Sequence, residues 1–134
     1  MIILSIDHGT RKLGLAVSDE TGFIAAPLPT LRVKNQKEAI EGITQIADDV
    51  RAEMLIIGLP SGWEGKDSEQ TTLVKDFAEM VKKATGLDYK FWDESYSSKQ
   101  AEFGARGRKR ANSDSEAARI ILQEYLDWQR EKPE

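Results

Sequence analysis

The chain has 134 residues, no cysteine and a formal net charge of −4, and 40% of its residues are hydrophobic. This size and composition predict a single globular domain over residues 1–134, and no apolar run approaches the roughly 20 residues that a membrane-spanning helix needs. The lack of cysteine excludes disulfides and thiolate metal sites and fits a cytoplasmic protein. The negative net charge excludes binding of nucleic acid by bulk charge but allows a local basic patch.

The first part of the chain has the pattern of three short strands. Residues 2–7 and 13–18 are apolar runs separated by a polar turn, and a third strand is expected from 23 to 26 with an extension to 33. Pro27 and Pro29 interrupt this third strand, which predicts an edge position or a bend. Three successive strands with tight turns predict an antiparallel meander.

After this meander, segments with helical spacing of apolar residues alternate with two short, continuous apolar runs. Helices are predicted at 36–53, 69–84, near 97–105 and from 113 onward, and strands at 54–60 and 89–94. Strands that alternate with helices favour a parallel arrangement covered by helices. The predicted fold class is therefore α/β, with a mixed five-stranded sheet made of an antiparallel meander plus parallel strands and flanked by helices.

Acidic residues end two of the predicted strands. Asp7 ends the first strand, and Asp93 and Glu94 end the fifth, where period-2 alternation allows only one of the pair to share the side of Asp7. An acid at the end of a buried strand is costly unless it is paired or binds a metal. With Asp114 at the start of the last helix, three acids lie in distant parts of one small domain. Such carboxylates suit Mg²⁺ or Mn²⁺, and two ions about 3.5–4 Å apart are typical of phosphoryl chemistry.

The acids of the last helix also have a structural interpretation. Ser113 and Glu116 fit a capping box, which is the favoured interpretation for Glu116. Asp114 in the first turn suits the helix dipole, so metal binding and helix stabilisation both stay open for this residue. His8 is expected to be a turn residue, because histidines that bind metals usually come in clusters.

Four segments, in the right order and over nearly the whole chain, resemble the YqgF/RuvX family of Holliday junction resolvases: IDHGTRKLGLAVSD, MLIIGLPSGWEG, WDESYSS and SDSEAARIILQEYL. The resemblance implies an RNase H-like fold and a nuclease whose catalytic, metal-binding carboxylates are Asp7, Glu94 and Asp114. It also implies Mg²⁺ or Mn²⁺, with two ions, and either branched DNA or precursor ribosomal RNA as substrate. Ser95 stands where the family has an arginine, which removes a bidentate phosphate contact.

Basic and aromatic residues near the predicted site are candidates for contacts with nucleic acid. They are Arg11 and Lys12 in the first turn, Trp63 and Lys66 after the fourth strand, and Arg106, Arg108, Lys109 and Arg110 before Asp114. Cations beside an acidic metal site would attract a polyanion, which favours a phosphate-gripping role over a solvated loop for the last four residues. Trp63 could stack on a base or pack against a helix. Gly9 is expected to let the backbone approach the substrate.

Two other classes of function fit parts of this pattern. An actin-like ATPase or sugar kinase also has a D-x-G-T loop, but that fold needs two domains and this length supplies one. A non-catalytic nucleic-acid-binding protein with the same fold is the main alternative, which Ser95 favours and the three acids oppose. If a four-way junction is cut symmetrically, a homodimer is expected.

Overall fold

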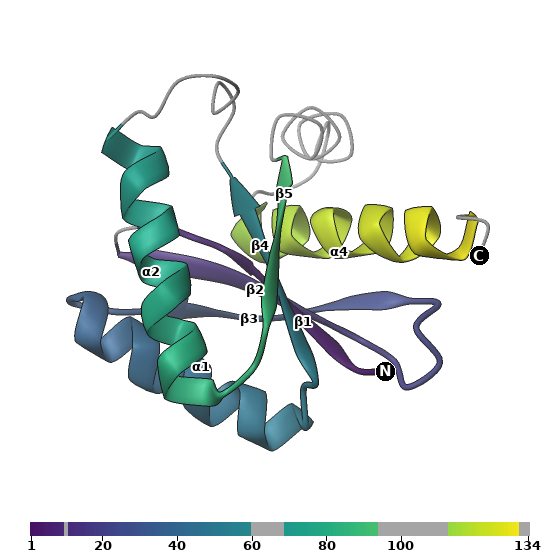
Figure 1. The fold of residues 1–134 in the computed structure, drawn as a ribbon, viewed down its shortest axis with the longest axis horizontal. Coiled ribbons are helices and arrows are strands. Elements are labelled where there is room, and N and C mark those ends of the chain that lie inside the picture. Colours follow the sequence, from purple (N-terminus) through teal and green to yellow (C-terminus); the bar gives the residue numbers. More distant parts are fainter. Residues whose placement is uncertain (10, 60–68, 94–112, 132–134) are drawn as a thin grey trace.

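The computed structural model describes residues 1–9, 11–59, 69–93 and 113–131. The elements in this part of the chain are, in order, β1 (Ile3–Asp7), β2 (Lys12–Ser18), β3 (Ala25–Arg32), α1 (Gln36–Val50), β4 (Met54–Leu59), α2 (Glu69–Thr85), β5 (Tyr89–Asp93) and α4 (Ser113–Glu131) (Figure 1). The helix predicted near 97–105 lies outside the described residues. None of the described helices is long and apolar enough to cross a bilayer.

The five strands form one mixed sheet in the order β3-β2-β1-β4-β5. β1 is central and pairs antiparallel with β2 and parallel with β4, while β2 pairs antiparallel with β3 and β4 parallel with β5. The predicted meander followed by parallel strands is therefore confirmed. β3 lies at one edge of the sheet, as Pro27 and Pro29 predicted, with Pro27 opposite Ala16 of β2.

Among the described residues, two element boundaries differ from the prediction by more than one residue, each for a local reason. The third strand starts at Ala25 because the Asp19 carboxylate accepts hydrogen bonds from the amides of Phe23 and Ile24, at 2.9 and 3.0 Å, and holds them in the turn. α1 ends at Val50 because Arg51 adopts a left-handed conformation, with φ of 60°, and caps the helix.

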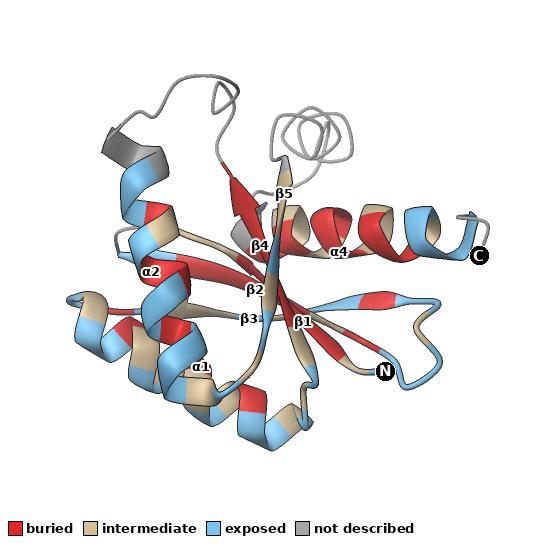
Figure 2. Cartoon of the chain, in the orientation of Figure 1, coloured by how far each residue is buried: buried red, intermediate tan, exposed pale blue. Residues whose placement is uncertain are grey.

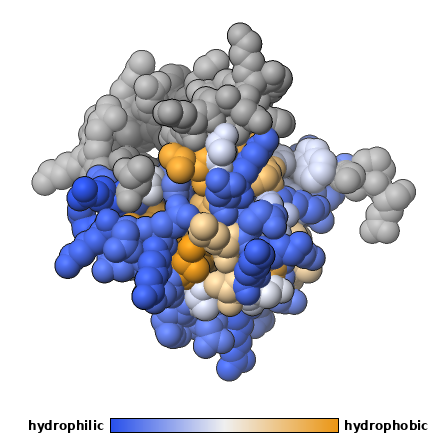
Figure 3. Space-filling model, turned by 60° about the vertical axis from the view of Figure 1, so that its left-hand side comes forward, coloured by the Kyte–Doolittle hydropathy of each residue, from blue (hydrophilic) through white to orange (hydrophobic). Residues whose placement is uncertain are grey.

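The helices cover the sheet on two sides. α1 and α2 pack on one face, where Leu4 and Ile6 of β1 join a buried cluster with Ile43 and Phe77. α4 packs on the other face over a second cluster that includes Ile3. Figure 2 shows buried residues along the central strands and on the inner sides of the helices. Figure 3 brings the left side of Figure 1 forward and shows a largely hydrophilic surface with apolar atoms in its middle.

Buried hydroxyl groups fix the position of α4 on its face of the sheet. The Ser5 hydroxyl donates a 2.7 Å hydrogen bond to the carbonyl of Ala118, and the Ser5 side chain is fully buried. One turn earlier in the helix, the Ser115 hydroxyl accepts a 3.4 Å hydrogen bond from the amide of Leu15 and lies 3.1 Å from the Thr30 hydroxyl. These contacts hold the first turns of α4 against β1, β2 and β3.

We expect Ser5→Ala to lower the free energy of unfolding by about 1 kcal/mol, because the change removes one buried hydrogen bond between the sheet and α4. Chemical denaturation measures the change. Thr44→Ala is the matched control, since the Thr44 hydroxyl donates to the Ile40 carbonyl of its own helix and alanine favours helix. A smaller loss for Ser5→Ala than for Thr44→Ala would contradict this account of α4.

Candidate functional site

The carboxyl ends of the three parallel strands meet at one edge of the sheet. β1 ends at Asp7, β4 at Leu59 and β5 at Asp93, and Leu59 is the register partner of Asp93. Figure 1 shows the arrowheads of β4 and β5 pointing toward the same side of the molecule. In open α/β sheets this edge is where ligands bind.

Asp7 lies at this edge on the side of the sheet that α4 covers. Side chains alternate along a strand, and Ser5, two residues earlier, bonds to α4. The carboxylate of Asp7 is half-buried, and its register partner on β2 is Gly14, which has no side chain to fill the space beside it. Asp7 is therefore a partly buried acid at the end of β1, on the sheet face that α4 covers.

The backbone of Asp114 lies in the first turn of α4, four residues before Ala118. Ser115 meets Leu15, whose register partner on β1 is Ile6, whereas Ala118 meets Ser5. The start of α4 thus points toward the carboxyl end of β1, and position 114 is one helical turn beyond the Ser5 contact, roughly 6 Å along the axis. The structure brings this first turn to the same end of β1 as Asp7.

The alternation of side chains predicted along β5 is confirmed up to Trp92. Phe91 packs with the α1 and α2 cluster, while the Trp92 ring lies 5.7 Å from Tyr125 of α4 and its indole nitrogen donates to Glu124 at 3.1 Å. Glu94 itself lies outside the described residues. Within the described part of the chain, no three histidine, cysteine or acidic side chains form a group that could hold a metal ion.

Glu116 is engaged by a neighbour on its own helix. Its carboxylate accepts hydrogen bonds from Nε and Nη2 of Arg119, the shortest at 2.7 Å, and this pairing raises the pKa of the Arg119 guanidinium. The capping box predicted for Ser113 and Glu116 stays a prediction, because the structure does not describe the side chain of Ser113. Two residues turn a helix by roughly 200°, so positions 114 and 116 face different sides of α4.

His8 lies in the turn after β1, as predicted. Its ring packs on Phe77 of α2 with the ring centres 4.5 Å apart, on the opposite face of the sheet from α4. Burial of the imidazole lowers the pKa of His8 and favours the neutral form. These contacts give His8 a packing role on the α2 side.

The rest of the turn explains its glycine. A Cβ atom on Gly9 would collide with the backbone carbonyl of Lys12, so a glycine is needed to close the turn. This steric requirement explains the glycine without the expected approach of its backbone to a substrate. The carbonyl of Arg11 accepts a 2.9 Å hydrogen bond from the amide of Val33, and the side chains of Arg11 and Lys12 are exposed. Both cations are therefore accessible beside the end of β1.

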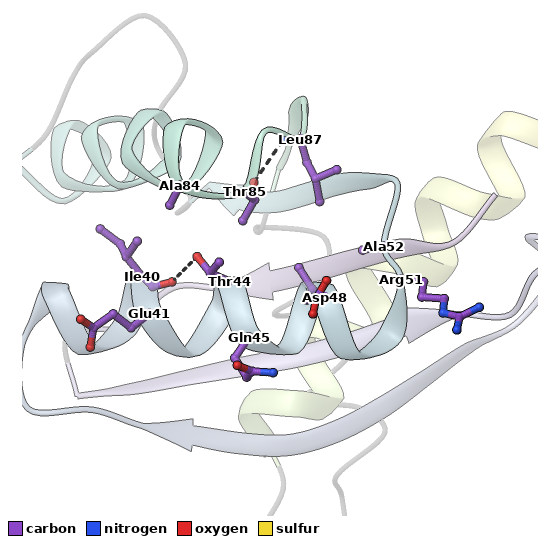
Figure 4. A pocket seen from close by; sticks show the side chains of 11 residues that line it. Ile40, Glu41, Thr44, Gln45, Asp48, Arg51, Ala52, Ala84, Thr85 and Leu87 are labelled. Carbon is purple, nitrogen blue, oxygen red and sulfur yellow. Dashed lines mark hydrogen bonds between the residues drawn. The ribbon is translucent and has the colours of Figure 1, made fainter.

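Two hollows lie on the side of the sheet that carries α1 and α2. One, of about 630 Å³, opens between the two helices at the amino ends of β4 and β5, with Ile40, Thr44 and Leu87 among its lining residues (Figure 4). It is at the opposite edge from Asp7 and contains no predicted site residue. The other, of about 180 Å³, adjoins the turn after Asp7 and is lined by His8, Gly9, Asn35, Gln36, Ala39 and Leu73. His8 and Gly9 were considered in the sequence only as turn residues, and Asn35 has a local sequence signal as a helix N-cap.

The other predicted contacts lie outside the described residues. They are Trp63 and Lys66 after β4, Ser95 beside Glu94, and the basic residues Arg106, Arg108, Lys109 and Arg110 before α4. Their roles remain predictions.

Comparison with known proteins places these features in a family. A family model described as RuvX, Holliday junction resolvase, matches residues 1–128. A protein of Paraburkholderia phymatum, named "Putative pre-16S rRNA nuclease", is 35% identical over 93% of this chain and 84% of its own length. One of Clostridium novyi with the same name is 35% identical over 95% of this chain and 98% of its own length.

The fold is also similar to solved resolvase structures. RuvC of T. thermophilus in complex with a Holliday junction substrate has a TM-score of 0.59 at 19% identity, over 98% of this chain and 96% of that one. The fowlpox virus Holliday junction resolvase has a TM-score of 0.57 at 11% identity, over 96% and 99% of the two chains. This similarity supports the RNase H-like fold. The match over residues 1–128 and the relatives at 35% identity show that the chain belongs to the RuvX family of Holliday junction resolvases, which are nucleases.

Proposed function

We propose that this chain is a divalent-metal-dependent nuclease that hydrolyses phosphodiester bonds in structured nucleic acid, with residues 1–134 acting as one catalytic domain in the cytoplasm. The observation that carries the proposal is the position of Asp7. It is a half-buried carboxylate at the carboxyl end of the central strand, on the face where the first turn of α4 is held. Burial of a carboxylate is costly unless the group is paired or binds a metal.

The donor set fits a hard divalent cation. Asp7, Glu94 and Asp114 would supply oxygen ligands, while the neutral His8 ring is packed on the other face against Phe77. Bound Mg²⁺ or Mn²⁺, as two ions, would activate a water and stabilise the leaving oxygen. Asp7 would be held in place for this role by β1, and Asp114 by the contacts that fix α4.

Positive side chains around the acids would bind the phosphate backbone. Arg11 and Lys12 are exposed in the turn beside Asp7, and Arg106, Arg108, Lys109 and Arg110 precede α4 in the sequence. Trp63 and Lys66 would add a stacking surface and a further cation. Because this set consists of phosphate and stacking contacts, it favours recognition of nucleic-acid shape over sequence.

Two substrates are proposed, branched DNA and precursor ribosomal RNA, which correspond to the family description and to the names of the relatives. A homodimer would provide the two active sites needed to cut a four-way junction symmetrically. The alternative is a protein of the same fold that binds nucleic acid without cleaving it. Ser95 motivates this alternative, because a serine replaces the arginine expected after Glu94.

Metal binding should stabilise the protein through Asp7. Clustered carboxylates repel one another, and a cation that binds the folded state at 100 times its Kd adds about 2.7 kcal/mol to the free energy of unfolding. We expect Mn²⁺ or Mg²⁺ to raise the melting temperature of the wild type and to raise that of Asp7→Asn much less. Equal shifts in thermal melts of the two proteins would remove Asp7 from the metal site.

The two acids of α4 should differ in their effect on catalysis. Asp114→Asn should reduce single-turnover cleavage by at least a hundredfold with little change in melting temperature. Glu116→Gln should stay active, because Glu116 pairs with Arg119 on the helix surface. Both variants are assayed with the wild type on four-way junction DNA, duplex DNA, single strands and structured RNA. Metal-dependent binding of these substrates without cleavage by the wild type would favour the non-catalytic alternative, and an inactive Glu116→Gln beside an active Asp114→Asn would move the ligand to Glu116.

The basic segment before α4 should contribute to affinity through charge. Replacing Arg106, Arg108, Lys109 and Arg110 with alanine should weaken binding to all sequences and reduce the slope of log K against log salt by roughly one for each phosphate that these side chains neutralise. Fluorescence anisotropy over a salt series measures both effects. Glu38→Ala on α1 serves as a surface control. An unchanged slope would mean that the four side chains do not contact phosphate.

A further inference from the structure

The pocket of about 180 Å³ beside Asp7 has no role in the site described so far. It is built where the turn after β1 meets the start of α1 and the first half of α2, and its lining residues are His8, Gly9, Asn35, Gln36, Ala39 and Leu73. His8 and Gly9 are the next two residues after Asp7. The pocket therefore adjoins the catalytic edge from the α2 side of the sheet.

Part of the pocket wall is aromatic or apolar. The His8 ring is supported by the tilted ring of Phe77, with the ring centres 4.5 Å and the ring planes 46° apart. Ala39 is buried, and Leu73 leaves 48% of its surface exposed at the rim. A supported ring and an exposed leucine form the kind of surface on which a planar heterocycle stacks.

Two carboxamides at the start of α1 add directional polar groups. Asn35 uses its Oδ1 to accept from the amide of Glu38 at 2.9 Å, so its Nδ2 is the group that can donate to a ligand. The side-chain Nε2 of Gln36 donates to the Met80 sulfur at 2.9 Å, so the side-chain Oε1 of Gln36 is the group that can accept a hydrogen bond from a ligand. The two consecutive lining residues thus offer one donor and one acceptor, the two kinds of group that the hydrogen-bonding edge of a nucleobase requires.

The volume limits the ligand. About 180 Å³ is the room of about six water molecules, well below the roughly 300 Å³ at which pockets for larger organic ligands begin. A single ring system fits this space, whereas a complete nucleotide does not. The sugar and phosphate would stay outside, toward the exposed Arg11 and Lys12.

We propose, on the basis of the nuclease function above, that this pocket binds the base of a nucleotide next to the scissile phosphate. The base stacks on the His8 ring and on Leu73, and Asn35 and Gln36 contact its polar edge. Holding the base out of its stack fixes the phosphate beside Asp7. Single strands, branch points and loops supply such unstacked bases at low cost, whereas a continuous duplex does not.

The test is a binding experiment that does not depend on cleavage. Isotope-labelled protein is titrated by NMR, without metal, with deoxycytidine and deoxyadenosine 5′-monophosphates and, separately, with 2-deoxyribose 5-phosphate, which lacks the base. We expect amide shifts at the lining residues with the nucleotides and at least tenfold weaker binding of the sugar phosphate. Leu73→Trp fills the pocket and should weaken nucleotide binding at least tenfold. Lys83→Trp, which adds the same ring at an exposed position later in α2, should leave it unchanged.

Each outcome decides for or against the pocket. Equal binding of nucleotide and sugar phosphate, equal effects of the two tryptophan variants, or no shifts at the lining residues would overturn the proposal. Cleavage by the same protein preparation is measured in parallel on four-way junction DNA and structured RNA. Base-dependent shifts without cleavage would contradict the nuclease function but not the base pocket, and cleavage without such shifts would contradict only the pocket.

Discussion

The hydrogen bond from the buried Ser5 hydroxyl to the Ala118 carbonyl is the contact on which the candidate site depends. It lies on a sheet face that is packed largely by apolar residues such as Ile3 and Ile56. Apolar surfaces can slide past one another at little cost, but a buried hydroxyl that loses its partner costs about 1–3 kcal/mol. This directional bond therefore sets where α4 crosses the sheet, and with it the distance between position 114 and Asp7.

Periodicity predicted the strands and helices of the described part of the chain because their hydrophobic patterns are long and regular. The boundaries that it missed depend on single side chains or backbone conformations. The Asp19 carboxylate accepts hydrogen bonds from two amides just before β3 and so delays the start of this strand. Arg51 ends α1 in a left-handed conformation that non-glycine residues rarely adopt. A pattern averaged over a window of residues does not contain such local events.

The candidate site was predictable to the extent that it follows strand geometry. Asp7 at a strand end, and the alternation that places Trp92 toward α4, come from a period of two. The contact between His8 and Phe77 and the pocket formed with Asn35 were not predicted. Both bring together segments that are far apart in the sequence, so their packing is set by the tertiary structure and not by a local pattern.

The two prolines of β3 have a consequence for the protein beyond its own fold. Sheets grow when a neighbouring chain adds a strand to an open edge, which requires amide hydrogens at every second residue. Pro27 and Pro29 lie on the edge strand β3, and each of them removes one amide hydrogen from it. Proline on an edge strand is one of the features that make such an edge a poorer template, so β3 is less suited to the intermolecular pairing from which aggregates grow.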